Sequence, residues 1–365
     1  MPSAPESARS RLSLVHWGQF SGTVPMIREP LQRHVDTVFH DFGTLTRVPS
    51  LLPSRAIAHL VCLGRSGPWF KTGVWSKAIQ RHAIEAGWIR RDRPTLFFQT
   101  LAAPVLGPDY RYVIYTDRLA REGAAEAEAF RSTWGPGWIE REQEFLARAE
   151  AIFVMGPSSR TALEKLYGMD GGKVKVVGAG PGTGIGPIGR ERRPARRLLF
   201  VGTNWGLKGG PEVVAAFSRV SGRHPDLELV LVGSDPVGPI PPRARALGRV
   251  PGRTMPGLFA ESDVFVVPTY MEALGYSLLE ALLQGLPAIG STVGNQGWMI
   301  GDAGTTVEPG DVDQIEQAIE TVLADYDGFK TRAIQRAEHL RETMTWDRVA
   351  STIVSTLLNE HDRRA

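Results

Sequence analysis

The stretch DVFVVPTYMEALGYSLLEALLQGLPAIGS, residues 263–291, decides the fold. It opens with an apolar run of the length of a buried strand and passes through a loop into a helix that we expect to begin near Tyr276. It closes with PAIGS, a second short apolar run at 287–291. Continuous apolar strands that flank a helix are typical of a parallel sheet covered on both faces. The stretch therefore predicts a strand–helix–strand unit of an α/β fold.

The same alternation continues along the rest of the chain. In the second half we expect further strands at 198–202, 227–233 and 305–309, and helices at 210–225, 256–262 and 311–325. In the first half the expected strands are 12–17, 35–41, 56–64, 95–100, 111–116 and 151–156, with a helix within 126–150. Gly and Pro concentrate in residues 181–195, which predicts a linker. The pattern favours two Rossmann-like domains, 1–182 and 183–345, that face each other across a cleft.

Composition excludes several classes of protein. The 365 residues, 42% of them hydrophobic, are enough for two globular domains. The single cysteine, Cys62, cannot form an intrachain disulfide, which fits a reducing compartment. We expect no signal peptide, because the first residues lack an apolar segment, and no apolar stretch approaches the roughly 20 residues of a spanning helix. The net charge of +3 comes with no dense basic stripe, so a nucleic-acid partner is not expected.

Two carboxylates and a helix start mark a candidate anion site. Gly275 interrupts the run between Glu272 and Glu280, so Glu272 is expected in a loop and Glu280 within the helix. The amides of the first turn, from Tyr276 and Ser277 onward, would then face the ligand crevice at the carboxyl ends of the strands. Such a site suits a diphosphate, with a hydroxyl acceptor on either side of it. The alternative is a loop carboxylate and a surface glutamate without a ligand.

A lysine supplies a second candidate for anion binding. Lys208 follows the strand 198–202 and precedes a helix, among glycines in FVGTNWGLKGGPEVVAAF, residues 200–217. A lysine at that place can neutralise phosphate charge. The sequence has no GxxxxGK[ST] motif, so it is not a Walker loop. A solvated surface lysine is the alternative.

These residues carry a resemblance to a known family. The second half resembles the nucleotide-binding domain of retaining GT-B glycosyltransferases, specifically glycosyltransferase family 4, through VGTNWGLKGG (201–210), LVLVGS (229–234) and the Glu-x7-Glu stretch. The resemblance implies that Glu272 binds hydroxyls of the donor sugar, Glu280 the ribose and Lys208 the diphosphate. The remaining donor-binding positions that it implies are the amides of Leu274, Gly275, Tyr276 and Ser277, and the nucleobase contacts Arg249 and Val250.

One departure from the family concerns phosphate binding. The family commonly carries an Arg shortly before the lysine, where this chain has Thr203, Asn204 and Trp205. Asn204 could donate a neutral hydrogen bond, and Trp205 could stack on a ligand or pack in the core. The absence of this cation is expected to affect which donor binds and how tightly it binds.

The first half resembles the family more loosely, as an acceptor-binding domain. LSLVHWGQFSGT, residues 12–23, implicates Gly18, with Ser21 or Gly22, near the donor diphosphate; a simple turn is the alternative. Asp117 stands where members often carry a His, and it could orient the acceptor hydroxyl or serve as its base. It could equally cap a helix. The last helix of the family, matched by 346–365, crosses back onto this domain.

The segment 65–93 mixes aromatic and basic residues. Trp69, Phe70, Trp75 and Trp88 occur among several Lys and Arg, a composition that can dock on an anionic membrane surface. Core packing below a solvated basic face is the alternative.

The resemblance implies a retaining hexosyltransferase. It would move a sugar from a nucleoside diphosphate sugar, UDP- or GDP-linked, to a hydroxyl of a lipid-linked or saccharide acceptor, in polysaccharide, glycolipid or glycoconjugate biosynthesis. We expect metal independence, because no Asp-x-Asp motif or metal-ligand spacing of His occurs, and no cofactor besides the donor. The expected location is cytoplasmic, with peripheral contact on the inner face of the membrane. The alternatives are a nucleotide-sugar epimerase of the same fold and a non-catalytic nucleotide-sugar-binding subunit.

Overall fold

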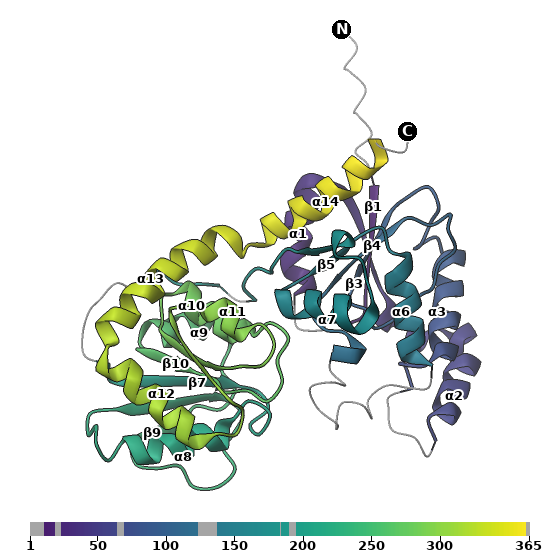
Figure 1. Cartoon of the computed structure of the whole chain (residues 1–365). Coiled ribbons are helices and arrows are strands. Elements are labelled where there is room, and N and C mark those ends of the chain that lie inside the picture. The colour runs from purple at the N-terminus through teal and green to yellow at the C-terminus, as the bar shows by residue number, and fades with distance from the viewer. Residues whose placement is uncertain are drawn as a thin grey trace. The chain divides into compact units, whose positions relative to one another are not determined.

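The chain divides into two units. The computed structural model describes residues 11–18, 23–63, 69–122, 137–182, 184–189 and 195–362. Unit 1 comprises residues 1–180 together with 346–365, and unit 2 comprises residues 181–345 (Figure 1).

Unit 1 is built on a parallel sheet of six strands in the order β2-β1-β3-β4-β5-β6. The strands are β1 (Arg11–His16), β2 (Asp36–Asp41), β3 (Thr95–Phe98), β4 (Tyr112–Thr116), β5 (Ile152–Val154) and β6 (Val174–Val176). The helices are α1 (Val24–His34), α2 (Leu52–Val61), α3 (Gly73–Glu85), α6 (Trp138–Arg148), α7 (Pro157–Tyr167) and α14 (Trp346–Asp362), with 3-10 turns η2 (Phe42–Arg47), η3 (Pro49–Leu51) and η4 (Gly171–Lys173).

Unit 2 repeats the plan with the strand order β12-β11-β10-β7-β8-β9, again parallel. Its strands are β7 (Arg197–Gly202), β8 (Glu228–Gly233), β9 (Ala244–Ala246), β10 (Val264–Val266), β11 (Ala288–Ser291) and β12 (Gly304–Val307). Its helices are α8 (Gly210–Val220), α9 (Met255–Ala260), α10 (Tyr276–Leu283), α11 (Gln296–Ile300), α12 (Val312–Ala324) and α13 (Tyr326–Thr343), with the 3-10 turn η5 (Gly252–Thr254).

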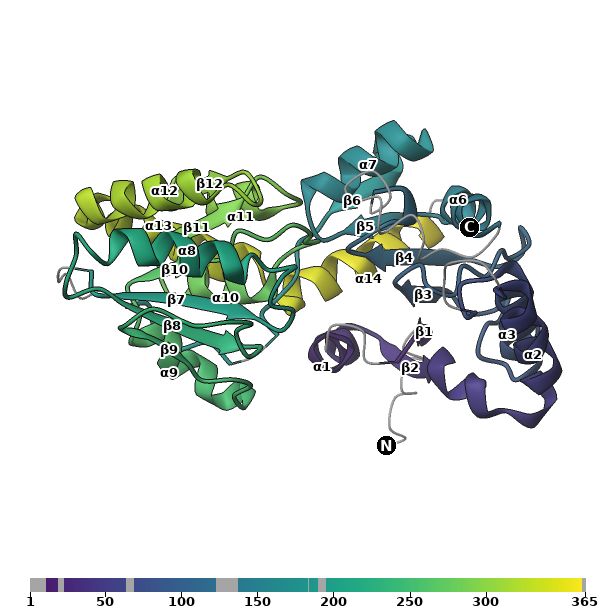
Figure 2. The same ribbon diagram turned by 90° about the horizontal axis from the view of Figure 1, so that it is seen from below.

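Both sheets are covered on both faces by helices, as Figures 1 and 2 show. Every residue of β3, β4, β5 and β10 is buried, and apart from Thr95 and Thr116 all of them are aliphatic or aromatic. The prediction of an α/β protein with two Rossmann-like domains is confirmed.

One predicted strand is wrong. Residues 56–64 were expected to pair in the sheet, but 52–61 form the helix α2, which has only Ala58 buried. A short apolar run does not distinguish a strand from a helix by itself. Pro53, in the first turn, favours the helix start, because its fixed φ suits that position. The short strands β6 and β9 and the helices α7, α11 and α13 were not predicted.

Helix α14 belongs to unit 1, although unit 2 separates it in sequence from the rest of that unit. It lies beside α1, where Arg33 of α1 and Asp347 of α14 form an ion pair at 2.6 Å. Its inner face, which includes Val349 and Ile353, is fully buried. Unit 1 therefore requires two segments of the chain.

Candidate functional site

The strongest candidate site lies at the carboxyl ends of β7 and β10, which are neighbours in the sheet of unit 2. Lys208 follows β7 and Glu272 follows β10. Because parallel strands end at the same edge, the two loops meet, and ligands of open α/β sheets bind at this edge.

Lys208 and Glu272 form an ion pair. The Nζ of Lys208 lies 2.5 Å from the Oε2 of Glu272, and each side chain is 19% exposed. The Oε1 of Glu272 accepts a hydrogen bond from the amide of Ala273 at 3.1 Å. The two groups predicted to bind diphosphate and sugar are thus in direct contact and reachable from solvent.

Hydrogen bonds fix the two loops to each other. The carbonyl of Leu207 accepts from the Oγ1 of Thr269 and from the amide of Tyr270, both at 2.9 Å. The side-chain amide of Asn295 donates to the carbonyl of Ala273 at 2.7 Å. Gly209 lies so close to β10's loop that a Cβ there would be 2.4 Å from the carbonyl oxygen of Pro268, and its φ is +77°. The loops are therefore held in place without the ion pair.

Helix α10 begins at Tyr276, as predicted, after Gly275 at φ +93°. The amides of its first turn lack partners within the helix and carry the positive end of its dipole. Leu274 is buried, whereas Tyr276 and Ser277 are half-buried. Glu272 precedes the helix start by four residues in the same loop, and its ion pair brings Lys208 to it from the loop after β7.

Glu280 lies within α10 and is only 5% exposed. Its Oε1 accepts from the amide of Gly182 at 3.1 Å, and the Oε1 of Gln284, one turn later, accepts from Gly186 at 3.1 Å. The carboxylate therefore holds the first residues of unit 2 against α10. The predicted ribose contact stays a prediction.

The structure separates the two interpretations of Trp205. This side chain is 8% exposed, its ring lies 5.6 Å from that of Phe200, and a Cβ on Gly210 would be 2.3 Å from it. Trp205 thus packs in the core. Asn204 caps the turn before Lys208, since its Oδ1 accepts from the amide of Leu207 at 3.2 Å.

Arg249 and Val250 follow β9, which is the edge strand of the sheet. Arg249 is exposed and Val250 is half-buried. They share the carboxyl edge with Lys208 and Glu272, but no interaction seen among the described residues joins them to that pair. Their predicted contact with a nucleobase is untested.

In unit 1, Gly18 lies just after β1, at φ +56°. Its amide donates to the Oδ1 of Asp41 at 2.7 Å, and the Nδ1 of His16 lies 3.0 Å from its carbonyl oxygen. Asp41 ends β2 and was not predicted as a site residue; its only signal was its place at the end of the expected strand 35–41. The alternative candidates Ser21 and Gly22 lie outside the described residues.

Asp117 follows β4 and is half-buried. Its carbonyl oxygen accepts from the Oγ of Ser159 at 2.7 Å. The helical residues beyond it begin at Ala120, so Asp117 is not the cap of that helix. Gln99 directly follows β3, the strand next to β4, and its φ is +78°. Its Oε1 accepts a hydrogen bond from the Oγ1 of Thr116 at 3.2 Å. Sequence analysis missed this strained glutamine.

A buried carboxyl lies behind these strand ends. Glu142 of α6 is fully buried and accepts from the Oγ1 of Thr100 at 2.6 Å, from the amide of Ala120 at 3.0 Å and from the hydroxyl of Tyr167. Burial raises the pKa of Glu142 despite these hydrogen bonds. Burial also lowers the pKa of Lys71 to about 8, with the charge of Glu142 acting in the opposite direction. No sequence motif indicates this cluster.

The aromatic residues of segment 65–93 lie in the core of unit 1. Trp75 is fully buried, and Trp69, Phe70 and Trp88 are partly buried against the same core. Core packing, the alternative interpretation of this segment, is what the structure shows for these side chains. Residues 65–68 lie outside the described residues.

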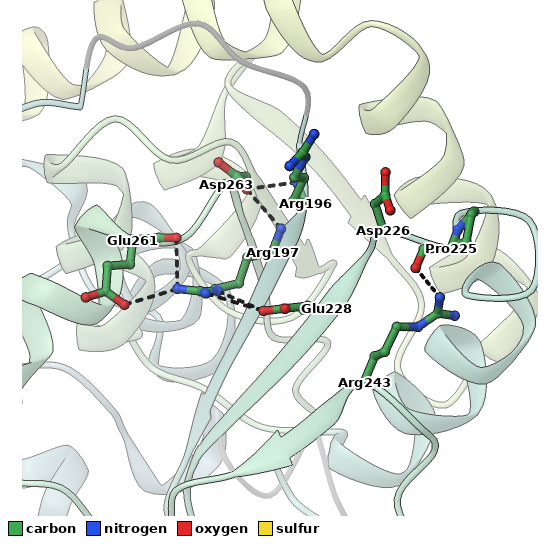
Figure 3. Close-up of a pocket in the computed structure, with 8 residues that line it drawn as sticks. All are labelled: Arg196, Arg197, Pro225, Asp226, Glu228, Arg243, Glu261 and Asp263. Atoms are coloured by element: carbon green, nitrogen blue, oxygen red, sulfur yellow. Dashed lines mark hydrogen bonds and ion pairs between the residues drawn. The ribbon is translucent and has the colours of Figure 1, made fainter.

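A pocket of about 460 Å³ lies at the opposite edge of the sheet of unit 2 (Figure 3). Three of its four carboxylates are already engaged: Arg197 pairs with Glu228 at 3.3 Å and with Glu261 at 3.0 Å, and Asp263 accepts from the amides of Arg196 and Arg197. It surrounds the amino ends of β7, β8 and β10, away from the carboxyl edge. We do not assign it to the donor.

Two absences concern the part of the chain that the structure describes. No group of three His, Cys, Asp or Glu side chains in this part of the chain is arranged to hold a metal ion. Nor does any described helix have the length and apolar character needed to cross a membrane.

Part of the second unit is similar to a known family. Residues 195–325 match the family described as "Glycosyl transferases group 1". This matching segment, called the group 1 segment below, lies within unit 2. This segment includes Lys208, Glu272 and Glu280.

Beyond the group 1 segment, a curated relative extends the match. A glycogen synthase of Mycobacterium tuberculosis is 25% identical over 246 residues, which make up 62% of this chain and 59% of that protein. The chain thus spans about three fifths of the length of that relative.

Solved structures match nearly the whole chain that carries the group 1 segment. A sucrose-phosphate synthase from Thermosynechococcus elongatus has a TM-score of 0.71 at 17% identity and covers 98% of this chain and 100% of its own. The Anabaena protein Alr3699/HepE, in complex with UDP and glucose, has a TM-score of 0.65 at 13% identity, with coverages of 96% and 100%. These likenesses show the fold, which is that of GT-B glycosyltransferases.

Proposed function

We propose that the protein is a glycosyltransferase that moves a sugar from a nucleoside diphosphate sugar to an acceptor hydroxyl. The observation that carries the proposal is the Lys208–Glu272 pair, held at 2.5 Å at the carboxyl edge of the sheet beside the start of α10, within the group 1 segment. A cation and helix amides suit a diphosphate, and a carboxylate suits sugar hydroxyls.

In this mechanism the charge that develops on the departing diphosphate is stabilised by Lys208 and by the first amides of α10. Fixed donors of this kind usually supply the largest catalytic contribution. Glu272, released from Lys208 by the incoming phosphate, accepts hydrogen bonds from the sugar. Glu280 would bind the ribose, with Arg249 and Val250 at the base. Asp117, in unit 1, would orient the acceptor hydroxyl or accept its proton.

The finer properties are proposed on the resemblance to glycosyltransferase family 4. They are retention at the anomeric carbon, transfer of a hexose, independence of metal ions and of any cofactor besides the donor, and a role in polysaccharide, glycolipid or glycoconjugate biosynthesis. The complex of Alr3699/HepE with UDP and glucose supports UDP over GDP as the nucleotide to test first. The acceptor is proposed to be lipid-linked or a saccharide, and the location cytoplasmic with peripheral contact to the inner face of the membrane.

The experiment is a panel of UDP-, GDP-, ADP- and dTDP-sugars, measured by protection from thermal unfolding and by donor hydrolysis, followed by transfer of labelled sugar from the best donor. We expect Glu272→Ala to reduce transfer by about 100-fold or more, as expected when an electrostatic contact to the reacting group is lost. The variant should keep its unfolding temperature, because Lys208 is 19% exposed and can turn to water.

Glu342→Ala, an exposed glutamate on α13, is the matched control and should transfer sugar at the rate of the unmodified protein. Normal transfer by Glu272→Ala would contradict the proposal. Interconversion of the donor sugar without any acceptor would indicate an epimerase, and binding without turnover would indicate a non-catalytic subunit. No observation on the structure favours either.

A further inference from the structure

Helix α2 of unit 1 exposes an unusual amount of apolar surface. Ala58 is its single buried residue, whereas Leu52, Ile57 and Leu60 are 48%, 49% and 63% exposed. Leu63, two residues beyond the helix, is 70% exposed. Isolated exposed apolar side chains are common, but a run of them on one helix is a feature of interaction surfaces.

The exposed apolar residues form one stripe. At about 100° per residue, Leu52, Ala56 and Leu60 fall within an arc of about 80°, and Pro53 and Ile57 border it. All five are exposed. A helix of a water-soluble domain normally turns such a stripe toward the core and its polar face toward solvent. In α2 the apolar stripe faces outward.

The surroundings of the stripe are basic. No Asp or Glu occurs between Asp41 and Glu85, a stretch that contains six Lys and Arg. α3 lies beside α2 (Figures 1 and 2), and its Lys77 and Arg81 are exposed. A groove of about 240 Å³ between the two helices is lined by both cations and, from the α2 side, by Ser50 and Ser54; its other lining residues are Leu51, Ala78, His82 and Glu85.

We propose that this surface, the α2 stripe with Lys77 and Arg81, docks the protein on an anionic phospholipid membrane. The stripe would enter the boundary between headgroups and acyl chains, and the groove would take lipid phosphates against its cations and hydroxyls. A second copy of the chain is a poorer occupant, because a symmetric contact would bring together two surfaces on which Lys77 and Arg81 outnumber the one carboxylate, Glu85. The inference does not depend on the proposed transfer activity.

This surface differs from the membrane contact expected through the aromatic residues of 65–93. Those aromatic rings are packed into the core, so the apolar part of the proposed membrane contact is on α2 instead. The cations of α3, Lys77 and Arg81, still lie within the segment 65–93. The apolar stripe of α2 and the cations of α3 can therefore be substituted separately.

The test is sedimentation of the full chain with vesicles of phosphatidylcholine alone or with 30% phosphatidylglycerol, at low and at physiological salt. We expect binding to the anionic vesicles that weakens with salt, and much weaker binding to the neutral ones. Lys77→Gln with Arg81→Gln should weaken binding by about 30-fold, from roughly 5-fold per charge at a membrane surface. Leu52→Gln with Leu60→Gln should weaken it by about 10-fold or more.

Val237→Gln, a substitution of an 85% exposed residue of unit 2, is the matched control and should bind as the unmodified protein does. All variants should keep the unfolding temperature, since the changed side chains are exposed. Equal binding to both vesicles, no binding to either, or binding insensitive to both double substitutions would overturn the proposal. A dimer in solution that Leu52→Gln with Leu60→Gln dissociates would instead assign the stripe to a second copy.

Discussion

Lys208 and Glu272 balance each other's charge through their ion pair. Each lies in a loop of its own, yet the two side chains meet at 2.5 Å because β7 and β10 are adjacent and parallel. The loops are also tied by backbone contacts at Leu207, so the pair is not their main support. The residues are therefore free to exchange partners without loss of the fold, which is what a binding site requires.

At the same scale, Lys71 makes stability depend on pH. Burial lowers its pKa to about 8 from an ordinary value of 10.5, so between these values the unfolded chain binds more protons than the folded chain. The contribution of Lys71 to the free energy of unfolding therefore increases as pH rises through this window. We expect Lys71→Met to lose that increase, measured by urea unfolding at pH 7.5, 8.5 and 9.5.

Lys77→Met, which changes an exposed lysine in the next helix, should keep the pH dependence of the unmodified protein. An identical pH dependence in Lys71→Met and the unmodified protein would contradict the assignment.

The sequence predicted the structural role of a residue where that role depends on its near neighbours in the chain. Gly275 and the helix start at Tyr276 follow from composition within a few positions. The contact between Lys208 and Glu272 spans 64 positions and needed the strand order, and the partners of Glu142 come from three separate elements. Whether Trp205 packs in the core or stacks on a ligand could not be predicted for the same reason, because its packing depends on where Phe200 and Gly210 lie in the fold.

At the scale of elements, the buried strands of both sheets were predictable because burial on two faces favours runs of apolar residues. The error at α2 has a matching cause. Apolar residues occupy the exposed face of α2, so its sequence lacks the polar face that usually marks a surface helix. The strands β6 and β9 lie at the edges of their sheets, and of their residues only Val174 is buried, so no continuous apolar run marks them.

Helix α14 should contribute strongly to the stability of unit 1. Ile353 is fully buried on it, and truncation of a buried isoleucine to alanine typically costs about 2–5 kcal/mol. We expect Ile353→Ala to lower the free energy of unfolding of unit 1 by that amount in a urea titration. Ser355→Ala, at an exposed position of the same helix, should change it by less than about 0.5 kcal/mol. Equal effects of the two substitutions would show that α14 does not pack as described.

At the scale of the whole molecule, the two units differ in how the chain builds them. All six strands and six helices of unit 2 lie within residues 181–345, with a buried core of their own. We expect a fragment of these residues to fold alone and to unfold cooperatively, measured by circular dichroism on heating. If the proposed function holds, UDP should protect it from unfolding.

Residues 1–180 without α14 provide the contrast. This fragment would expose the apolar residues that α14 covers beside α1, so it should be aggregation-prone or lack a cooperative transition. A stable fragment 1–180 together with an unfolded fragment 181–345 would contradict the described division.

The discontinuity of unit 1 also sets an order of events during synthesis. A ribosome adds about 5–20 residues per second, so roughly 10–30 s pass between the emergence of residue 180 and that of α14. During that interval unit 2 can be completed, while the nascent first unit still lacks the helix that covers α1. The part of the protein made first is therefore finished last, and its uncovered apolar surface is a substrate for chaperones until translation reaches Trp346 and beyond.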